Sequence, residues 1–459
     1  MPSRSTWGLV AATIAATVSV TAAVLVVADR EPSTSVTARD TPDVRPAVRW
    51  TLDAATYLDR PFGAFSDPRG GASFGAGKTG FVESGDTLVT LAGSPTDSSA
   101  LGDAVMIGID ADTGRVRWRS PADDLEGCGG TPLDGALYCY AHPASGSALV
   151  RYDLGTGRVE RRTIDEFVFG ITTADGTLYV AEGNPEDSEV RVHAGTYDDI
   201  SARWERDVAI GAPWEGVYSD QVLAVTDGVG LVQTGSEMVQ FDARTGDEGW
   251  KPAESDCVSS AALHPGGVVA VADGNCSGQG GPRRQVLRGP TGKILATTTS
   301  GAVQNLSVDA RANPRGFVLL GDEAVDRRSG KRRWSSAELR TGHDGSLGTA
   351  TAIVGSTVYV TGGDPQTEAG VDMLTGEQRW SRPVTDRFTP RAGAGNVLVG
   401  DDGSALHAID VRTGRRVWTL PFRSLDPDPE VFAHGGTTVH HDDGWIHSSD
   451  RRIVGLDDP

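Results

Sequence analysis

Basic side chains are scarce in this chain of 459 residues, where 42 lysines and arginines face 62 aspartates and glutamates and leave a formal net charge of −20. A protein that binds nucleic acid or an anionic membrane surface needs a basic face that can release counterions. We therefore expect no nucleic-acid partner. An acidic surface instead helps to keep an exported protein in solution.

Long helical patterns are also missing from the body of the chain. Short apolar runs are separated by turn-forming residues, among them 59 glycines and 24 prolines. Alternating or β-branched runs between turn signals are typical of strands, so this composition predicts an all-β body.

The chain contains no His-Glu-x-x-His, and we find no Gly-x-Ser-x-Gly nucleophile elbow, because the one match to that pattern, Gly71 to Gly75, is not flanked by the strand and helix that an elbow needs. Paired carboxylates for glycoside hydrolysis would leave no such signature, because they come from distant parts of a chain. The stretch ASFGAGKT, Ala72 to Thr79, fits a permissive phosphate-loop pattern. Its flanks indicate loop and strand rather than strand and helix, so we interpret the match as accidental.

Uncharged runs of more than 20 residues are absent except for one, which includes the 21 residues from Trp7 to Val27. At about 1.5 Å per residue, a helix of this length spans a hydrocarbon core of about 30 Å. Arg4 precedes the run, so the positive-inside rule places the body outside the cell. We predict a cytoplasmic N-terminus at residues 1–6 and a transmembrane signal-anchor helix at residues 7–28.

A cleaved signal peptide is the alternative, because Val26-Val27-Ala28 fits a small-residue cleavage pattern. Cleavage after Ala28 would give a secreted protein, whereas a retained helix gives a single-pass protein of the cell membrane with an extracellular body. Residues 29–47 are rich in Pro, Ser, Thr, Asp and Arg and lack an apolar period, which is typical of a flexible linker.

The four cysteines fall into two close pairs, and each pair flanks a turn signal. Neighbouring strands of a hairpin in an exported protein favour disulfides, so we predict Cys128–Cys139 and Cys257–Cys276, each contributing about 3 kcal/mol. No pair has the gap of two to four residues that a zinc knuckle uses.

A nine-residue frame recurs along the body, with Asp first, Thr-Gly fourth and fifth, and Trp ninth. The five copies are DADTGRVRW, DARTGDEGW, DRRSGKRRW, DMLTGEQRW and DVRTGRRVW. Their frame residues are Asp110, Thr113, Gly114 and Trp118; Asp242, Thr245, Gly246 and Trp250; Asp326, Gly330 and Trp334; Asp372, Thr375, Gly376 and Trp380; and Asp410, Thr413, Gly414 and Trp418.

Degenerate copies of the frame lie between these five copies. Counted with them, the Thr-Gly positions recur every 38 to 46 residues. A period of this length with strand-like content predicts a β-propeller of four-stranded antiparallel blades over residues 48–459. Nine units can be counted if one is split between the termini. Since propellers usually have four to eight blades, we expect about eight, with one unit forming only a partial blade.

The frame has a physical interpretation. Its Gly can take positive φ in a tight turn between the third and fourth strands, and its Asp and Thr can hydrogen-bond the turn backbone. Its Trp supplies an apolar face that we expect to pack between blades. The tryptophans that fit this position are Trp50, Trp118, Trp204, Trp250, Trp334, Trp380 and Trp418.

Ring closure can also be predicted. The stretch VRWTL, Val48 to Leu52, closely matches RVWTL, Arg416 to Leu420, whereas the last unit stops after Asp457, which takes the first frame position. We expect residues near Trp50 to complete the final blade, because closure removes exposed sheet edges.

The frame resembles the tryptophan-docking motif of the pyrroloquinoline-quinone-like, or quinoprotein-type, propellers of exported bacterial proteins. This family includes quinone-dependent dehydrogenases, an outer-membrane assembly lipoprotein, sensor domains and binding proteins, so the resemblance implies fold rather than activity. Its dehydrogenases carry a disulfide between adjacent cysteines and acidic calcium ligands. This chain has no Cys-Cys pair and no clear calcium loop, so we expect no bound cofactor.

Two acidic stretches are candidate cation sites. In HHDDGWIH, His440 or His441 with Asp442 could bind a divalent cation, but Asp442-Asp443-Gly444 is also a hairpin turn signal. In DPDPE, Asp426 to Glu430, three carboxylates could hold calcium, but a solvated acidic loop is the simpler interpretation. We therefore assign no metal or catalytic residue.

We expect an exported, membrane-anchored, monomeric propeller that binds a protein, peptide or glycan at the cell envelope without catalysis. An extracellular enzyme is the alternative, either a quinoprotein dehydrogenase or a hydrolase or lyase with a site at the end of the channel. A structural member of an envelope complex would differ from the first only in its partner.

Overall fold

The structure is a computed structural model, and the residues it describes fall within Thr41–Pro459, the second of two compact units. It describes residues 44–458 apart from 74–78, 98–99, 145, 185–188, 209–221, 235–236, 254–257, 274–283, 301–303, 305, 312–315, 340–347, 363–366, 385–387 and 433–435. The predicted membrane helix at residues 7–28 and linker at residues 29–47 lie wholly or mostly outside these residues. None of the described helices has the length and apolar character needed to span a membrane.

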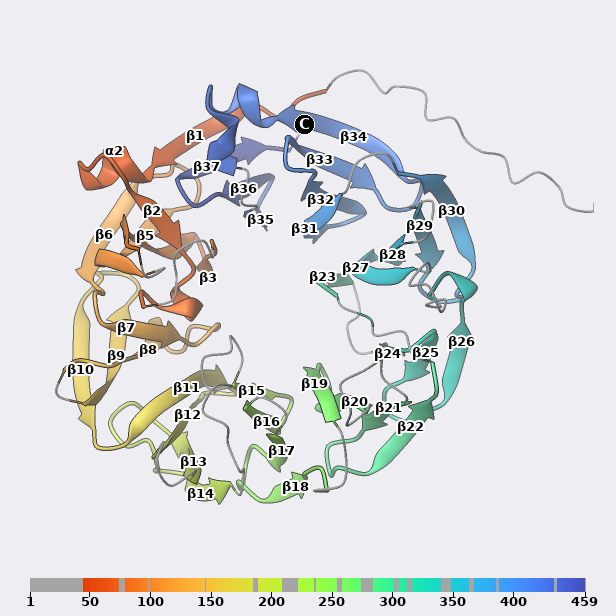
Figure 1. Ribbon diagram of the computed structural model, residues 1–459, viewed down its shortest axis with the longest axis horizontal. Coiled ribbons are helices and arrows are strands. Elements are labelled where there is room, and N and C mark those ends of the chain that lie inside the picture. The colour runs from red at the N-terminus through yellow and green to blue at the C-terminus, as the bar shows by residue number, and fades with distance from the viewer. Residues whose placement is uncertain are drawn as a thin grey trace, which may run out of the picture. The chain divides into compact units, whose positions relative to one another are not determined.

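The strands of the described residues form nine sheets, which follow one another in chain order around a ring (Figure 1). We number them as blades. Blade 1 contains β2 (Ala64–Ser66), β3 (Val82–Ser84), β4 (Thr87–Pro95), β5 (Leu101–Asp110) and β6 (Val116–Pro121). Blade 2 contains β7 (Leu125–Cys128), β8 (Ala136–Ala141), β9 (Ser147–Asp153) and β10 (Val159–Ile164), and blade 3 contains β11 (Phe167–Ala174), β12 (Thr177–Asn184), β13 (Glu189–Gly195) and β14 (Trp204–Val208).

Blade 4 contains β15 (Leu223–Thr226), β16 (Val229–Thr234), β17 (Glu237–Asp242) and β18 (Glu248–Trp250), and blade 5 contains β19 (Val258–His264), β20 (Val268–Asp273), β21 (Arg284–Arg288) and β22 (Ile294–Thr298). Blade 6 contains β24 (Phe317–Leu320), β25 (Glu323–Asp326) and β26 (Arg332–Ser335). Blade 7 contains β27 (Thr349–Gly355), β28 (Thr357–Gly362), β29 (Thr367–Asp372) and β30 (Gln378–Pro383), with β23 (Val308–Arg311) beside β27.

Blade 8 contains β31 (Thr389–Ala394), β32 (Val397–Asp401), β33 (Ala405–Asp410) and β34 (Arg415–Pro421), and blade 9 contains β35 (Thr437–His441), β36 (Gly444–Ser448), β37 (Arg452–Asp457) and β1 (Val48–Asp53). The short helices are α2 (Ala54–Leu58), η1 (Pro68–Gly70), η3 (Ala337–Leu339), η4 (Phe422–Ser424) and η5 (Pro429–Phe432).

The expected number of about eight blades is wrong, because each of the nine repeat units forms its own sheet. Units that lose the Thr-Gly or Trp frame residues, such as those of blades 3 and 5, still form four paired strands. Strand pairing depends on alternating apolar residues and turns rather than on the frame. Blade 6 is the incomplete one, since β23 pairs in parallel with β27 of blade 7 instead of with β24.

Tight hairpins and apolar strands explain how the blades form. The β11–β12 turn holds Asp175 at φ 48° and Gly176 at φ 71°, a two-residue turn with positive φ at both positions that matches the twist of paired strands. The apolar side chains meet between neighbouring blades. One cluster joins Trp50 and Ile446 of blade 9 to Phe65 and Ile107 of blade 1.

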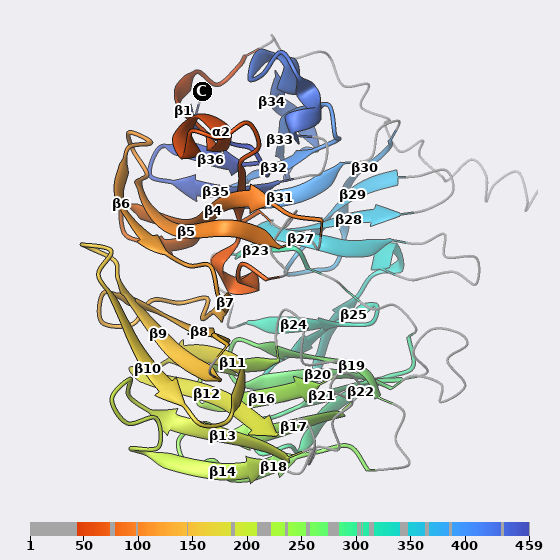
Figure 2. The ribbon, with the colours of Figure 1, turned by 60° about the vertical axis from the view of Figure 1, so that its left-hand side comes forward.

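The ring closes where the VRWTL stretch predicts. Strand β1 pairs antiparallel with β37, with Leu52 opposite Ile453 and Asp53 opposite Arg452, so the first strand completes the last blade (Figures 1 and 2). Asp53 then caps α2 by accepting a hydrogen bond from the Thr56 backbone N–H at 2.8 Å.

The predicted disulfide Cys128–Cys139 is confirmed, and it joins directly opposed residues of β7 and β8. The predicted pair Cys257–Cys276 lies outside the described residues.

Candidate functional site

The ninth-position tryptophans dock onto the turn of the following blade. Trp118 donates its indole N–H to the Leu154 carbonyl at 2.8 Å, and a Cβ added at Gly157 would collide with the Trp118 ring. Trp50 makes the same bond to Ala111 at 3.0 Å across the closure of the ring. The bond recurs from Trp204 to Ala243 (3.0 Å), from Trp334 to Met373 (2.9 Å) and from Trp380 to Val411 (2.7 Å). These side chains therefore hold neighbouring blades together rather than contacting a ligand.

Two frame tryptophans behave differently. Trp250 is half-buried and lies 4.0 Å below the guanidinium of Arg288. Trp418 is buried, yet its indole N–H has no hydrogen-bond partner among the described residues.

The first-position Asp stabilises the turn in the units that keep it. In blade 1, Asp110 accepts hydrogen bonds from the backbone N–H and the hydroxyl of Thr113 at 2.9 and 2.7 Å, and Gly114 takes φ 69°. Arg117 adds a 2.6 Å salt bridge to Asp110. The hydrogen bonds from Arg117 and then Thr113 lower the pKa of Asp110 to about 2.

The Asp110→Asn variant is expected to be less stable than wild type at neutral pH and to lose less stability as the pH falls. Because the pKa of Asp110 in the folded state lies below its unfolded value, the ionised carboxylate stabilises the fold above about pH 4, and this contribution disappears as the pH falls towards 2. Urea unfolding at pH 6, 4, 3 and 2 measures the free energy of unfolding of wild type and variant. Asp97→Asn, which changes an exposed carboxylate, is the control. Parallel stability curves for wild type and Asp110→Asn would contradict the assignment.

The turns between third and fourth strands lie on one face of the ring, because every blade runs in the same sense. We call these turns, with the first residues of the strands that follow them, the turn rim. Two of the large apolar side chains exposed in the described residues lie there, Ile294 at 48% and Leu374 at 67% exposure. Five exposed basic side chains on the rim make no ion pair with any described residue: Arg115, Lys293, Arg328, Lys331 and Arg415. The rim thus combines cations and apolar groups in an otherwise acidic protein.

A pocket of about 370 Å³, the rim pocket, opens where blades 4, 5 and 6 meet. It is lined by Asp227, Gly266, Val268, Pro290, Leu295, Arg327 and Arg328. Arg327 is buried, and its guanidinium donates to the Pro265 carbonyl. Arg328 is exposed, so its guanidinium can meet a carboxylate from another molecule.

A second cavity, of about 200 Å³, lies between blades 7 and 8. It is lined by Glu368, Arg382, Pro383, Val384, Phe388, Asp402, His407, Ile409 and Arg416. With two carboxylates, an imidazole and two guanidinium groups, this inter-blade cavity is the described site that most resembles an enzyme centre.

Four ionisable groups of the inter-blade cavity form two pairs. Glu368 pairs with Arg382 at 2.7 Å, and Asp402 contacts the His407 imidazole at 2.6 Å. Burial would raise the pKa of Asp402, but hydrogen bonds from His407 and Ser404 outweigh it and lower the pKa to about 2. Burial lowers the pKa of His407 despite its bond to Asp402. Asp402 is therefore ionised at neutral pH and is not a general acid.

A third polar set resembles a nucleophilic triad. His193 lies 2.8 Å from Glu182 and 2.9 Å from the Ser201 hydroxyl. The Ser201 hydroxyl, however, donates to Glu205 at 3.1 Å, and none of these residues lines either cavity. The set is best explained as a polar network that links β12, β13 and β14.

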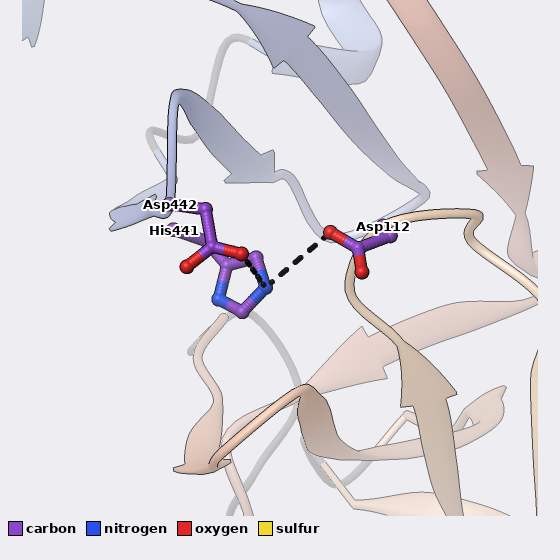
Figure 3. A group of neighbouring side chains, drawn as sticks. All are labelled: Asp112, His441 and Asp442. Atoms are coloured by element: carbon purple, nitrogen blue, oxygen red, sulfur yellow. Dashed lines mark ion pairs between the residues drawn. The ribbon is translucent and has the colours of Figure 1, made fainter.

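The stretch HHDDGWIH forms the β35–β36 hairpin, as its turn signal predicts, and Asp442 takes φ 47°. His440 packs edge-on against Trp445 at 4.8 Å. His441 points the other way, and its Nε2 lies 3.7 Å from Asp112 of blade 1 and 3.9 Å from Asp442 (Figure 3).

The interpretation of DPDPE as a solvated acidic loop is wrong for Asp426, which is buried and pairs with Arg452. This pairing keeps the Asp426 carboxylate inside the protein. The Ala72–Thr79 stretch is followed by strand β3 rather than a helix, and its residues 74–78 lie outside the described part.

The rim pocket and the grouping of Asp112 with His441 were not predicted from the sequence. The DRRSGKRRW copy did carry a signal for the rim, because its concentration of basic residues within a turn is unusual in a chain of net charge −20. No local pattern connects Asp112 to His441.

Residues 323–458 match the family model for the outer membrane protein assembly factor BamB. A protein named outer membrane protein assembly factor BamB, from Burkholderia pseudomallei (strain K96243), is 24% identical over 267 residues, which cover 54% of this chain and 65% of that protein. The match thus spans less than two thirds of the relative's length. The resemblance to pyrroloquinoline-quinone-like repeats is confirmed, and the chain is a β-propeller whose repeats are similar to those of BamB.

Solved structures also align with the chain at low identity. BamB from Moraxella catarrhalis aligns over 90% of this chain and 98% of its own, with 12% identity and a TM-score of 0.41. Quinohemoprotein alcohol dehydrogenase from Comamonas testosteroni aligns over 90% of this chain and 76% of its own, with 12% identity and a TM-score of 0.44.

Proposed function

We propose that this protein is an exported, membrane-anchored scaffold that binds another polypeptide of the cell envelope through its turn rim, without catalysis. The similarity of its repeats to an assembly factor for outer membrane proteins supports an envelope protein as the partner. The uncharged run at residues 7–28 supports the anchor.

The observation that carries this proposal is the combination of unpaired cations and exposed apolar groups on the turn rim. Arg328 and Lys331 extend from the blade 6 turn beside the rim pocket, and Leu374 is 67% exposed in the turn of the next blade. The blade 6 turn is held by Asp326, which accepts hydrogen bonds from the backbone N–H groups of Arg328 and Ser329. The blade 7 turn is held by Asp372 and by Trp334 of the preceding blade, so little conformational entropy is lost when a partner binds. Rigid apolar and arginine side chains are typical of protein interfaces.

The chemistry of the rim indicates the partner. Lysine and arginine cations select carboxylates, and a pocket of about 370 Å³ has room for one or two side chains. We infer that the partner presents a segment with acidic and apolar residues. An uncharged glycan would leave the cations unpaired and is the weaker candidate.

The inter-blade cavity supports a role without catalysis. Its carboxylates and imidazole are paired, and the lowered pKa of Asp402 keeps this carboxylate ionised at neutral pH, so Asp402 is not the general acid that glycoside hydrolysis needs.

Site-specific photo-crosslinking in intact cells tests the proposal. A photoreactive amino acid at Lys331 or Leu374 is expected to capture one discrete envelope protein. The same amino acid at Ala144 or Asp97, in second-to-third-strand loops on the opposite face, should capture none. The Arg328→Glu and Lys331→Glu double variant should abolish the crosslink from Leu374 and leave thermal stability unchanged. Equal capture from both faces, or capture that survives the charge reversal, would contradict binding through the turn rim.

A further inference from the structure

We propose that Asp112, His441 and Asp442 form a binding site for a divalent transition-metal ion at the seam where the propeller closes. The site is independent of the proposed scaffold function. It joins the first blade to the last, because Asp112 belongs to the β5–β6 turn of blade 1 whereas His441 and Asp442 belong to the β35–β36 hairpin of blade 9 (Figure 3).

The His441 imidazole is the group that needs an explanation. Its side chain is only 10% exposed, and its Nε2 is buried without a hydrogen-bond partner among the described residues. Leaving a buried polar atom without a partner is destabilising, so such atoms normally bind a partner or an ion. Nε2 points between two carboxylates, at 3.7 Å from Asp112 and 3.9 Å from Asp442, too far for hydrogen bonds but on either side of a shared space.

The spacing suits a metal ion after a small movement. The three ligand atoms lie within 4.8 Å of one another. Ligands bonded to zinc at about 2.0–2.1 Å in a tetrahedral site are roughly 3.3 Å apart. The Asp112 and Asp442 side chains are 55% and 77% exposed, so rotation of their carboxylates can close the difference without disturbing the core.

The ligand set indicates the class of ion. One imidazole and two carboxylates suit zinc and similar first-row ions, whereas calcium prefers six to eight oxygen ligands. Three protein ligands leave a coordination position for water or for a group of another molecule.

The backbone around the site is fixed before any ion binds. Asp112 lies inside the turn held by Asp110 and by Trp50 of β1. His441 lies on β35, which pairs along its length with β36. Two rigid elements from opposite ends of the chain therefore present the ligands, and an ion between them would bind the closed ring more tightly than the open one.

Zinc titration of the full-length protein, treated with a chelator and followed by calorimetry, tests the site. We expect one zinc ion per chain, a rise in melting temperature when zinc is added, and, with Co²⁺, a visible absorption spectrum of nitrogen and oxygen ligation. Asp112→Asn should weaken zinc binding at least ten-fold and abolish the rise in melting temperature. His441→Ala should weaken binding at least a hundred-fold.

Two neighbouring substitutions are matched controls. Asp443→Asn changes the adjacent carboxylate of the same hairpin, and His440→Ala removes the adjacent imidazole, which faces Trp445 instead. Both should bind zinc within about two-fold of wild type. Asp112→Asn alters an exposed side chain, so loss of folding will not obscure the result. Zinc affinity that is unchanged in both Asp112→Asn and His441→Ala would overturn the proposal, as would no zinc binding by the wild-type protein.

Discussion

Replacing Trp50 with alanine is expected to lower the free energy of unfolding by about 3–5 kcal/mol, the usual effect of removing a buried tryptophan. Trp50 is 8% exposed, donates its indole N–H to Ala111 at 3.0 Å and covers Gly114. It is the docking tryptophan at the point where β1 closes the ring. Its loss weakens the joint between the first and last blades, and chemical denaturation followed by circular dichroism measures the change.

Trp50→Phe separates the hydrogen bond from the packing, and we expect this variant to lose about 1–2 kcal/mol. Trp250→Ala is the control, because Trp250 occupies the same frame position but is only half-buried. We expect a smaller loss for Trp250→Ala than for Trp50→Ala. Equal losses would mean that the closure contributes no more than any other joint between blades.

The second large effect is expected at Arg452, whose removal should cost about 3 kcal/mol. Arg452 on β37 bonds Asp53 at 3.1 Å, donates to the Leu425 carbonyl at 3.1 Å and pairs with the buried Asp426. It therefore joins β1 and the segment between β34 and β35 to β37 of blade 9. In the Arg452→Ala variant the Asp426 carboxylate stays buried without its partner, which is strongly destabilising.

A double variant tests this explanation. Adding Asp426→Ala to Arg452→Ala removes the unpaired charge, so we expect it to restore part of the lost stability rather than add to the loss. Arg423→Ala, at an exposed arginine of η4, is the matched control and should change stability by less than about 0.5 kcal/mol. Additive losses at Arg452 and Asp426 would show that the two side chains act independently.

The two cavities suggest different uses of the same ring. In the inter-blade cavity, Glu368 pairs with Arg382 within blade 7, and Asp402 pairs with His407 within blade 8. Arg382 also donates to the Gly414 carbonyl of blade 8, which joins the two blades. In the rim pocket Arg328 faces solvent. In the proposed function, the basic residues of the turn rim, rather than the acidic net charge of the chain, select the partner.

Much of the fold could be predicted because its determinants are local. The Asp-to-Trp frame covers nine residues, and its hydrogen bonds and positive-φ glycine lie within one turn. The Cys128–Cys139 disulfide joins opposed strands of one hairpin. The number of blades was harder to predict, because frame residues decay in units whose strands still pair, and because β23 leaves its own blade for the next one.

The sequence by itself determined the repeated blade, the docking position of Trp50 and the closure of the ring by residues 48–53. These features could be predicted because the copies of the frame repeat the same local turn and the same docking position. Only the tertiary structure decided which residues from different blades meet. Closure brings Asp112 beside His441, buries Asp426 against Arg452 and places Arg328 at a pocket shared by three blades. The physical reason is that such contacts depend on the rotation and spacing of whole blades around the ring, which no segment of the chain encodes alone.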